Sequence, residues 1–213
     1  MAKITPALIK EDISEELKNE CLAHLETLVV LGKSKCDFYS KQIMYDLENA
    51  GIGRDKTFPI QNIQSSVSDF RAFTLDETKN ISNEVNKVIN GFVDNSILKT
   101  CEKILVGYMD TILASNNDEA ERSLYFAVLE GTSMIRFDFA GWAKKVNSEV
   151  LRNKCDKISA FVLFRSVVEM KKIRLNDFIA VYQLTVSAEN PEYNIRQIVE
   201  KCEAIYKIFN NYR

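Results

Sequence analysis

Residues 123–143 read SLYFAVLEGTSMIRFDFAGWA, and this stretch decides the fold. In its first half Leu124, Phe126 and Val128 fall on alternate positions. A period of two is the pattern of a β-strand, whose successive side chains point to opposite faces. Gly131-Thr132 is a turn signal, so the stretch predicts a β-hairpin. The two predicted strands are 123–130 and 133–143.

The second of these strands separates its side chains by polarity. Ile135, Phe137 and Phe139 share one face, whereas Arg136 and Asp138 lie on the other. This alternation indicates a strand with one face on the core and one face in water. We therefore expect Asp138 to be an outward-facing aspartate rather than a catalytic carboxylate.

Two long strands are expected after the hairpin, over 158–170 and 173–186. Residues 159–164, SAFVLF, are apolar at positions on both faces, which is typical of a central strand covered on both sides. The second of the two strands contains Asp177. Like Asp138, this aspartate is expected to point outward.

Helical periodicity dominates the rest of the chain. The strongest signal lies in the region from 75 to 115, where apolar residues recur at three- and four-residue steps and predict a helical hairpin. Thr74 and Glu77 read as its capping box. Gly32 is expected to end or interrupt the first long helix, and residues 52–73 are ambiguous. The expected helices are 12–31, 35–49, the hairpin 75–115 and a last helix that starts at Asn190-Pro191.

These elements predict an α+β fold. Helical hairpins pack around a mainly antiparallel sheet, and a C-terminal helix closes the structure, because helices and strands are segregated along the chain. We expect a single domain over 1–213. Its N-terminal helical part covers 1–115, its β-rich part 120–187, and its C-terminal helix 190–211.

Composition excludes some function classes. The 213 residues carry 28 Lys and Arg against 30 Asp and Glu, a formal net charge of −2. A nucleic-acid-binding protein usually has a basic excess or stripe, so no nucleic-acid partner is expected. The first thirty residues contain charges throughout, which leaves no apolar core for a classical signal peptide. We expect production in the cytoplasm, with later release left open.

The sequence contains few candidates for catalysis. His24 is the one histidine, and no phosphate-binding glycine motif is present. The five cysteines are widely spaced and lack a Cys-x-x-Cys pair, which indicates reduced, mostly buried thiols. We predict no catalytic residue, no cofactor and no metal site. An enzyme that uses carboxylates or a cysteine remains an alternative.

One group of residues is a candidate contact surface for a membrane or partner. Trp142 follows Gly141 at the end of a predicted strand, next to Lys144 and Lys145, and an aromatic ring beside lysines suits a membrane interface. Lys171 and Lys172 form a second basic pair. The alternatives are a tryptophan at the rim of the core and lysines at solvated loop ends.

The arrangement of elements resembles that of the Cyt-type cytolysins, the small insecticidal δ-endotoxins and their fungal relatives. The resemblance is carried by the helical hairpin at 75–115, the segment Asn117–Ala120 that leads into a strand, and the strand pair over 158–186. It implies membrane binding and oligomerisation. The strand 158–170 is long enough to reach across hydrocarbon if its covering helices move away. No functional residue is carried over from the family.

Two main function hypotheses follow. The first is a membrane-active, pore-forming cytolysin-like protein that is soluble before membrane contact, with a lipid membrane and further copies of itself as partners. The alternative is a non-catalytic protein-interaction or self-assembling protein, of the inclusion-forming or immunity type.

Overall fold

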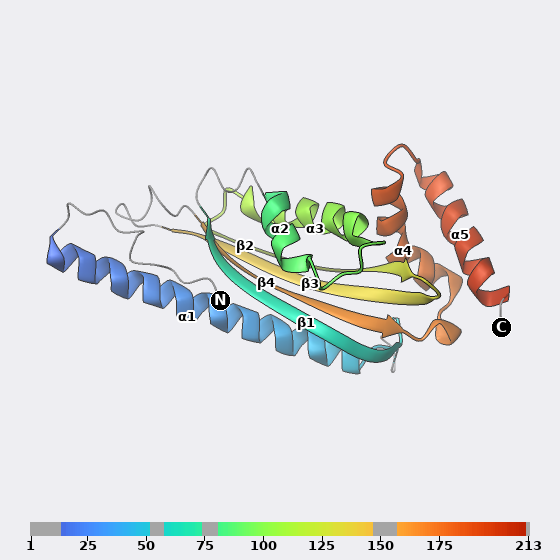
Figure 1. Ribbon diagram of the computed structural model, residues 1–213, viewed down its shortest axis with the longest axis horizontal. Helices are drawn as coiled ribbons and strands as arrows, with labels where there is room; N and C mark the ends of the chain where they lie inside the picture. The colour runs from blue at the N-terminus through green and yellow to red at the C-terminus, as the bar shows by residue number, and fades with distance from the viewer. Residues whose placement is uncertain (1–13, 52–57, 74–80, 147–156, 212–213) are drawn as a thin grey trace.

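The computed structural model describes residues 14–51, 58–73, 81–146 and 157–211. A four-stranded antiparallel sheet with the order β1-β4-β3-β2 forms the centre. Helix α1 lies along one face, α2 and α3 cover the other, and α4 and α5 lie at one end (Figure 1). The strands are β1 (Ile60–Phe73), β2 (Glu119–Glu130), β3 (Ser133–Lys145) and β4 (Lys157–Val168). The helices are α1 (Glu15–Glu48), α2 (Ile81–Ile89), α3 (Leu98–Leu113), α4 (Leu175–Glu189) and α5 (Ile195–Asn211).

The α+β class, the mainly antiparallel sheet and the closing C-terminal helix are confirmed. The predicted hairpin is formed by β2 and β3, which pair from Glu130 and Ser133 at the turn. Gly131 has a φ of 60°, a left-handed conformation that glycine adopts readily at a tight turn. The strand expected over 158–170 is β4, and it is central because β1 and β3 pair on either side of it.

The strand expected over 173–186 is wrong, because this segment forms α4. Phe178, Val181, Tyr182 and Thr185 are all buried, and their steps of three and four residues place them on one helical face. The aromatic and β-branched residues suit a strand by composition, but the spacing of the buried ones suits a helix. Asp177 therefore lies in the first turn of a helix, where Arg174 donates hydrogen bonds to its carboxylate.

Helix α1 continues through Gly32 as one helix of 34 residues, so the expected break there is wrong. A Cβ atom at Gly32 would lie 2.0 Å from a ring carbon of Phe70 in β1. The glycine therefore permits close approach of helix and sheet instead of ending the helix. Strand β1 occupies a segment whose sequence pattern is ambiguous. This segment lies within residues 1–115, the part of the chain that is expected to be helical.

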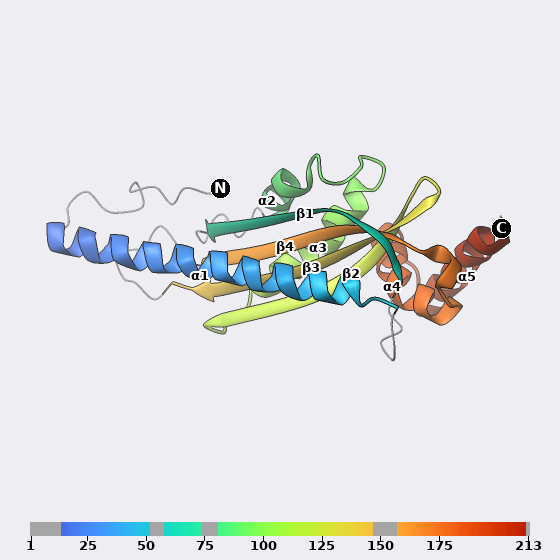
Figure 2. The ribbon, with the colours of Figure 1, turned by 90° about the horizontal axis from the view of Figure 1, so that it is seen from below.

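Helices α2 and α3 form the predicted hairpin and pack on β2, β3 and β4 through a large apolar cluster. The capping box at Thr74 and Glu77 lies outside the described residues. A second cluster joins α1 to the opposite face of the sheet, and a third joins α4 and α5 to the sheet's end. Figure 2 shows α1 running lengthwise over the strands. None of the helices in the described ranges is long and apolar enough to cross a bilayer.

The face of β3 that is expected to meet water is buried. Arg136 and Asp138 are only 3% and 6% exposed. Helix α1 covers Ala140 and Trp142 on this face, and α4 packs on Met134 near the strand's other end. The prediction fails because alternating polarity does not reveal which helices will cover a face. The burial of this face places two opposite charges inside the protein, where each needs a partner.

Candidate functional site

A groove of about 830 Å³ lies beside this buried charge pair. Its walls come from the C-terminal half of α1 and from strands β2 and β3, with one residue each from α3 and α4. The volume falls within the range typical of pockets for small molecules. Strand β2 is at the edge of the sheet, so side chains from both of its faces reach the groove. The polar residues of the α1 wall are Gln42, Tyr45, Asp46 and Asn49.

Arg136 and Asp138 are the buried charged residues of the lining. Their side chains point to the same face of β3 because they are two residues apart. The Arg136 Nε atom lies 3.1 Å from Oδ1 and 2.8 Å from Oδ2 of Asp138, and Nη2 also donates to Oδ1. The guanidinium carbon lies 4.4 Å from the ring centroid of Tyr125, a cation–π contact from the neighbouring strand.

One nitrogen of Arg136 is left over. Nη1 is buried and has no hydrogen-bond partner among the described residues, and the same holds for Oγ of Ser166. Ser166 stands opposite Arg136 in the β3–β4 register. A buried donor without an acceptor costs roughly 1–3 kcal/mol. The sheet therefore holds an unsatisfied donor within the lining of the groove.

The carboxyl group of Asp138 is held in an unusual environment. Burial raises its pKa, and the charge and hydrogen bonds of Arg136 oppose that rise. The nearby Asp46 carboxylate raises the pKa further. Both oxygens of Asp138 already accept hydrogen bonds from Arg136, so this carboxylate is committed to the pair.

The rest of the lining combines aromatic rings, aliphatic side chains, uncharged polar groups and the carboxylate of Asp46. Tyr45 is 67% exposed and Tyr125 is 40% exposed, so both rings present surface to a ligand. Ser123 and Tyr108 add hydroxyl groups. The lining contains one arginine and two aspartates, which gives a formal charge of −1 when all three are ionised.

Trp142, the aromatic member of the predicted contact surface, lies elsewhere and is fully buried. Its indole N–H donates to Glu119, and Nζ of Lys35 lies 5.3 Å from its ring centroid. Lys35 also forms an ion pair with Glu119 at 3.0 Å. Tyr39 donates a hydrogen bond of 2.9 Å to Glu121. These contacts hold the middle of α1 against the β2–β3 hairpin. Trp142 is therefore a core residue in this structure.

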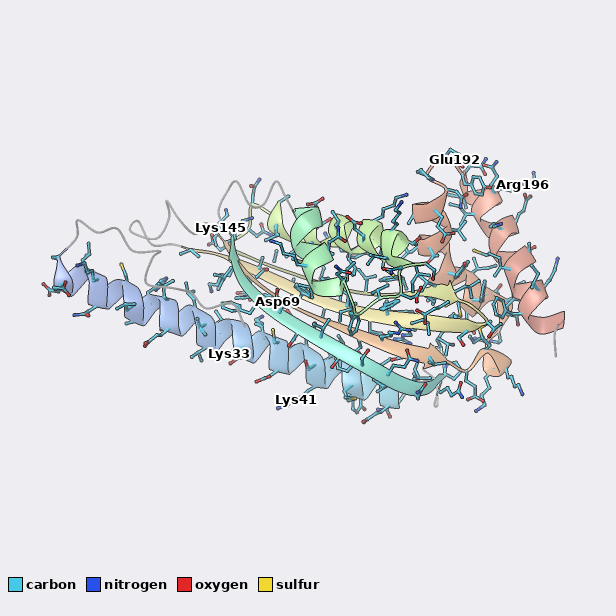
Figure 3. All side chains as sticks on the ribbon, viewed as in Figure 1. Lys33, Lys41, Asp69, Lys145, Glu192 and Arg196 are labelled. Carbon is cyan, nitrogen blue, oxygen red and sulfur yellow. The ribbon has the colours of Figure 1, made fainter. Side chains whose placement is uncertain are left out.

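The predicted basic residues lie at opposite ends of the sheet. Lys144 forms a long ion pair with Glu119, and Lys145 donates to the carbonyl of Asn116. Lys171 and Lys172 follow β4 at the other end, where Lys172 pairs with Glu169. Figure 3 shows Lys145 at the end remote from α4 and α5. The structure therefore does not bring the five predicted residues together on one surface.

Sequence reasoning does not select the groove residues as a site. The alternation of β3 places Arg136 and Asp138 on a wet face, and no motif singles out Tyr45 or Asp46. The one signal is a pair of opposite charges two residues apart in the otherwise apolar segment 134–143. Two such charges are stabilised by water when they are exposed. When they are buried, they must be stabilised by pairing with each other.

Two other kinds of site find no support in the described part of the chain. No group of three or more His, Cys, Asp and Glu side chains there is arranged to hold a metal ion. Burial raises the pKa of Cys36 and Cys202 to about 11 and that of Cys101 to about 12. Thiols with such pKa values are poor nucleophiles at neutral pH.

Comparison with known proteins assigns no relationship. No protein-family model, no curated protein and no solved structure matches the chain. The site's own geometry is therefore the basis for a functional proposal.

Proposed function

We propose that this protein binds a small polar ligand in the groove between α1 and β2. The observation that carries the proposal is the buried, unpartnered Nη1 of Arg136 in the lining of that groove. A ligand atom that accepts a hydrogen bond there would remove the cost of the unsatisfied donor. This is a binding function rather than catalysis, since Arg136 already engages both oxygens of Asp138.

Stability alone is a weak reason to bury such a pair. Replacing a buried ion pair with well-packed apolar residues is often neutral or stabilising, because desolvation offsets the attraction between the charges. The flanking positions on this face of β3, Met134 and Ala140, are apolar and buried, so an apolar side chain suits the surroundings. The charges are better explained by recognition of a ligand.

A thermal-shift screen tests the proposal across many classes of ligand at once. The full chain is melted with a collection of small polar molecules that includes sugars, amino acids, amines and organic anions. Binding to the folded state raises the melting temperature, and at ten times Kd the gain is about 1.4 kcal/mol, a shift of several degrees. If the whole collection leaves the melting temperature unchanged, the proposal fails.

Two exposed aromatic residues of α1 supply a matched pair for this screen. Tyr45 belongs to the lining of the groove, whereas Phe38 is 59% exposed and lies outside it. We expect Tyr45→Ala to reduce the ligand-induced shift and Phe38→Ala to leave it unchanged. If both variants changed the ligand-induced shift by the same amount, the ligand would bind elsewhere on the protein.

The membrane-active function implied by the cytolysin resemblance is a second proposal. Strand β4 has 12 residues, above the roughly 9–11 that a transmembrane strand needs. Ala160 and Val162 pack beneath α1, whereas Phe161 and Leu163 belong to the cluster of α2 and α3. Insertion would require these helices to leave the sheet, and several copies to pair the strand edges that would otherwise be unsatisfied in lipid.

Release of a trapped dye from liposomes tests this second proposal. Vesicles of anionic and of zwitterionic lipids are both used. Gly32→Ala strains the contact between α1 and Phe70, so it should speed release if α1 must detach. Gly107→Ala serves as the control, because a Cβ at Gly107 would meet nothing within 4 Å. No release from either kind of vesicle would remove the proposal.

A further inference from the structure

We infer that the ligand of the groove is a neutral saccharide. This inference rests on the proposed binding function and specifies the chemical class. It is carried by three features of the lining: its charge balance, its mixture of donors and acceptors, and its exposed aromatic rings. The charge balance disfavours an anion, the unpartnered donor disfavours a cation beside it, and the aromatic rings suit the faces of a sugar ring.

The charge balance opposes an anion. The positive charge of Arg136 is already matched by Asp138, with Nε within 3.1 Å of both carboxylate oxygens. Asp46 adds a second carboxylate to the same lining. A phosphate or carboxylate would therefore meet a site of negative formal charge. Sites that recognise such groups instead present uncommitted arginine forks or lysines.

The unpartnered nitrogen of Arg136 opposes a cation. Arg136 lines the groove, and its buried Nη1 is a donor that carries part of a positive charge. An ammonium group has three donors and no acceptor, so it cannot accept this hydrogen bond. A sugar hydroxyl can accept from Nη1 and at the same time donate its own proton.

The wall on α1 supplies the complementary groups. Gln42 and Asp46 lie one turn apart, so their side chains share one side of the helix. Asn49 donates from its Nδ2 to the backbone carbonyl of Tyr45 at 2.7 Å, which leaves its side-chain oxygen as an acceptor. Carboxylate and amide oxygens accept hydrogen bonds from hydroxyl groups, and amide nitrogens donate to them.

The aromatic rings supply the apolar part of recognition. The Tyr125 ring has Arg136 on one face, and the residue remains 40% exposed. Tyr45 is two-thirds exposed. A sugar ring carries C–H groups on its faces, and these pack on aromatic rings while the hydroxyls at its edge remain free to bond.

The test measures binding of the full chain to immobilised neutral, sialylated and sulfated oligosaccharides, followed by calorimetric titration of the best-bound one. We expect a neutral oligosaccharide to bind at least tenfold more tightly than its sialylated or sulfated analogue. Asp46→Ala and Tyr45→Ala should each weaken that binding at least tenfold. The matched controls on the same helix, Asp37→Ala and Phe38→Ala, should change it less than twofold.

The outcomes separate this inference from the proposed function. Preference for a charged oligosaccharide, or equal loss in the control variants, overturns the saccharide assignment. If no oligosaccharide binds while an amine, amino acid or anion produces a Tyr45-dependent thermal shift, the groove binds a ligand of another class. If neither assay finds a ligand, both the inference and the proposed function fail.

Discussion

At the scale of single residues, the feature that sets this protein apart is the buried pair of Arg136 and Asp138. Their side chains belong to one strand, so the backbone fixes their spacing. The pair is nearly solvent-free, yet one guanidinium nitrogen lacks a partner in the described structure. Most buried polar groups in folded proteins have a hydrogen-bond partner, so this unpartnered donor calls for an explanation.

Removal of one charge from this pair is expected to be costly. Asp138→Ala leaves Arg136 buried without its counter-ion and should lower the free energy of unfolding by about 3–5 kcal/mol. Urea unfolding followed by circular dichroism measures the change. Arg174 and Asp177 form an exposed pair with similar hydrogen bonds, so Asp177→Ala is the control, with a change below about 1 kcal/mol. Similar losses in the two variants would mean that burial does not amplify the charge interaction.

Glu119 gives a prediction for pH dependence. The hydrogen bond from the Trp142 indole lowers the pKa of this carboxyl below its usual range, and Lys35 contributes in the same direction. A lowered pKa stabilises the folded state above the unfolded pKa, and this stability is lost as pH falls through the folded pKa. Glu119→Gln should therefore cost under about 1 kcal/mol at pH 7, because the side chain is partly exposed.

The same cost should shrink towards zero below the folded pKa of Glu119, where the natural side chain is itself uncharged. Chemical unfolding of both proteins between pH 2.5 and pH 7 follows the difference. Glu200→Gln, in an exposed pair with Arg196 on α5, is the control and should stay within about 0.5 kcal/mol. A difference that stays constant over this pH range would contradict an electrostatic role for Glu119.

At the scale of elements, α1 depends on a glycine where the helix packs against Phe70 of β1. Gly32→Ala adds a methyl group where the Phe70 ring already lies, and overpacking of this kind costs about 1–3 kcal/mol. In α3, a Cβ at Gly107 meets no atom within 4 Å, so Gly107→Ala should stabilise by about 0.5–1 kcal/mol. Thermal unfolding measures both. Stabilisation by both variants would show that Phe70 moves aside freely.

The elements also show what the sequence could predict. The β2–β3 hairpin and β4 follow from alternation and a turn signal, which are local properties. Segment 173–186 has the composition of a strand, although its buried residues follow a helical spacing. Strand β1 is an edge strand with exposed polar residues such as Gln61 and Ser66, so it lacks a clear apolar pattern. Its pairing with β4 is a long-range contact that no local pattern contains.

At the scale of the whole molecule, the candidate site arises from the way helices share one face of the sheet. Helix α1 covers one part of this face and α4 another, and the polar pair lies between their apolar clusters. The residues of the groove come from segments that are far apart in the chain. Alternating polarity locates Arg136 and Asp138 on a common face, but only the tertiary packing makes that face an interior one.

The double variant Arg136→Met/Asp138→Leu tests the central claim most directly. It replaces both charges with apolar side chains, which should leave the melting temperature of the free protein at or above its natural value. The measurement is the shift in melting temperature caused by ligands that stabilise the natural chain. We predict that the double variant folds and shows no shift with those ligands. A folded double variant with the full natural shift would contradict a binding role for the buried pair.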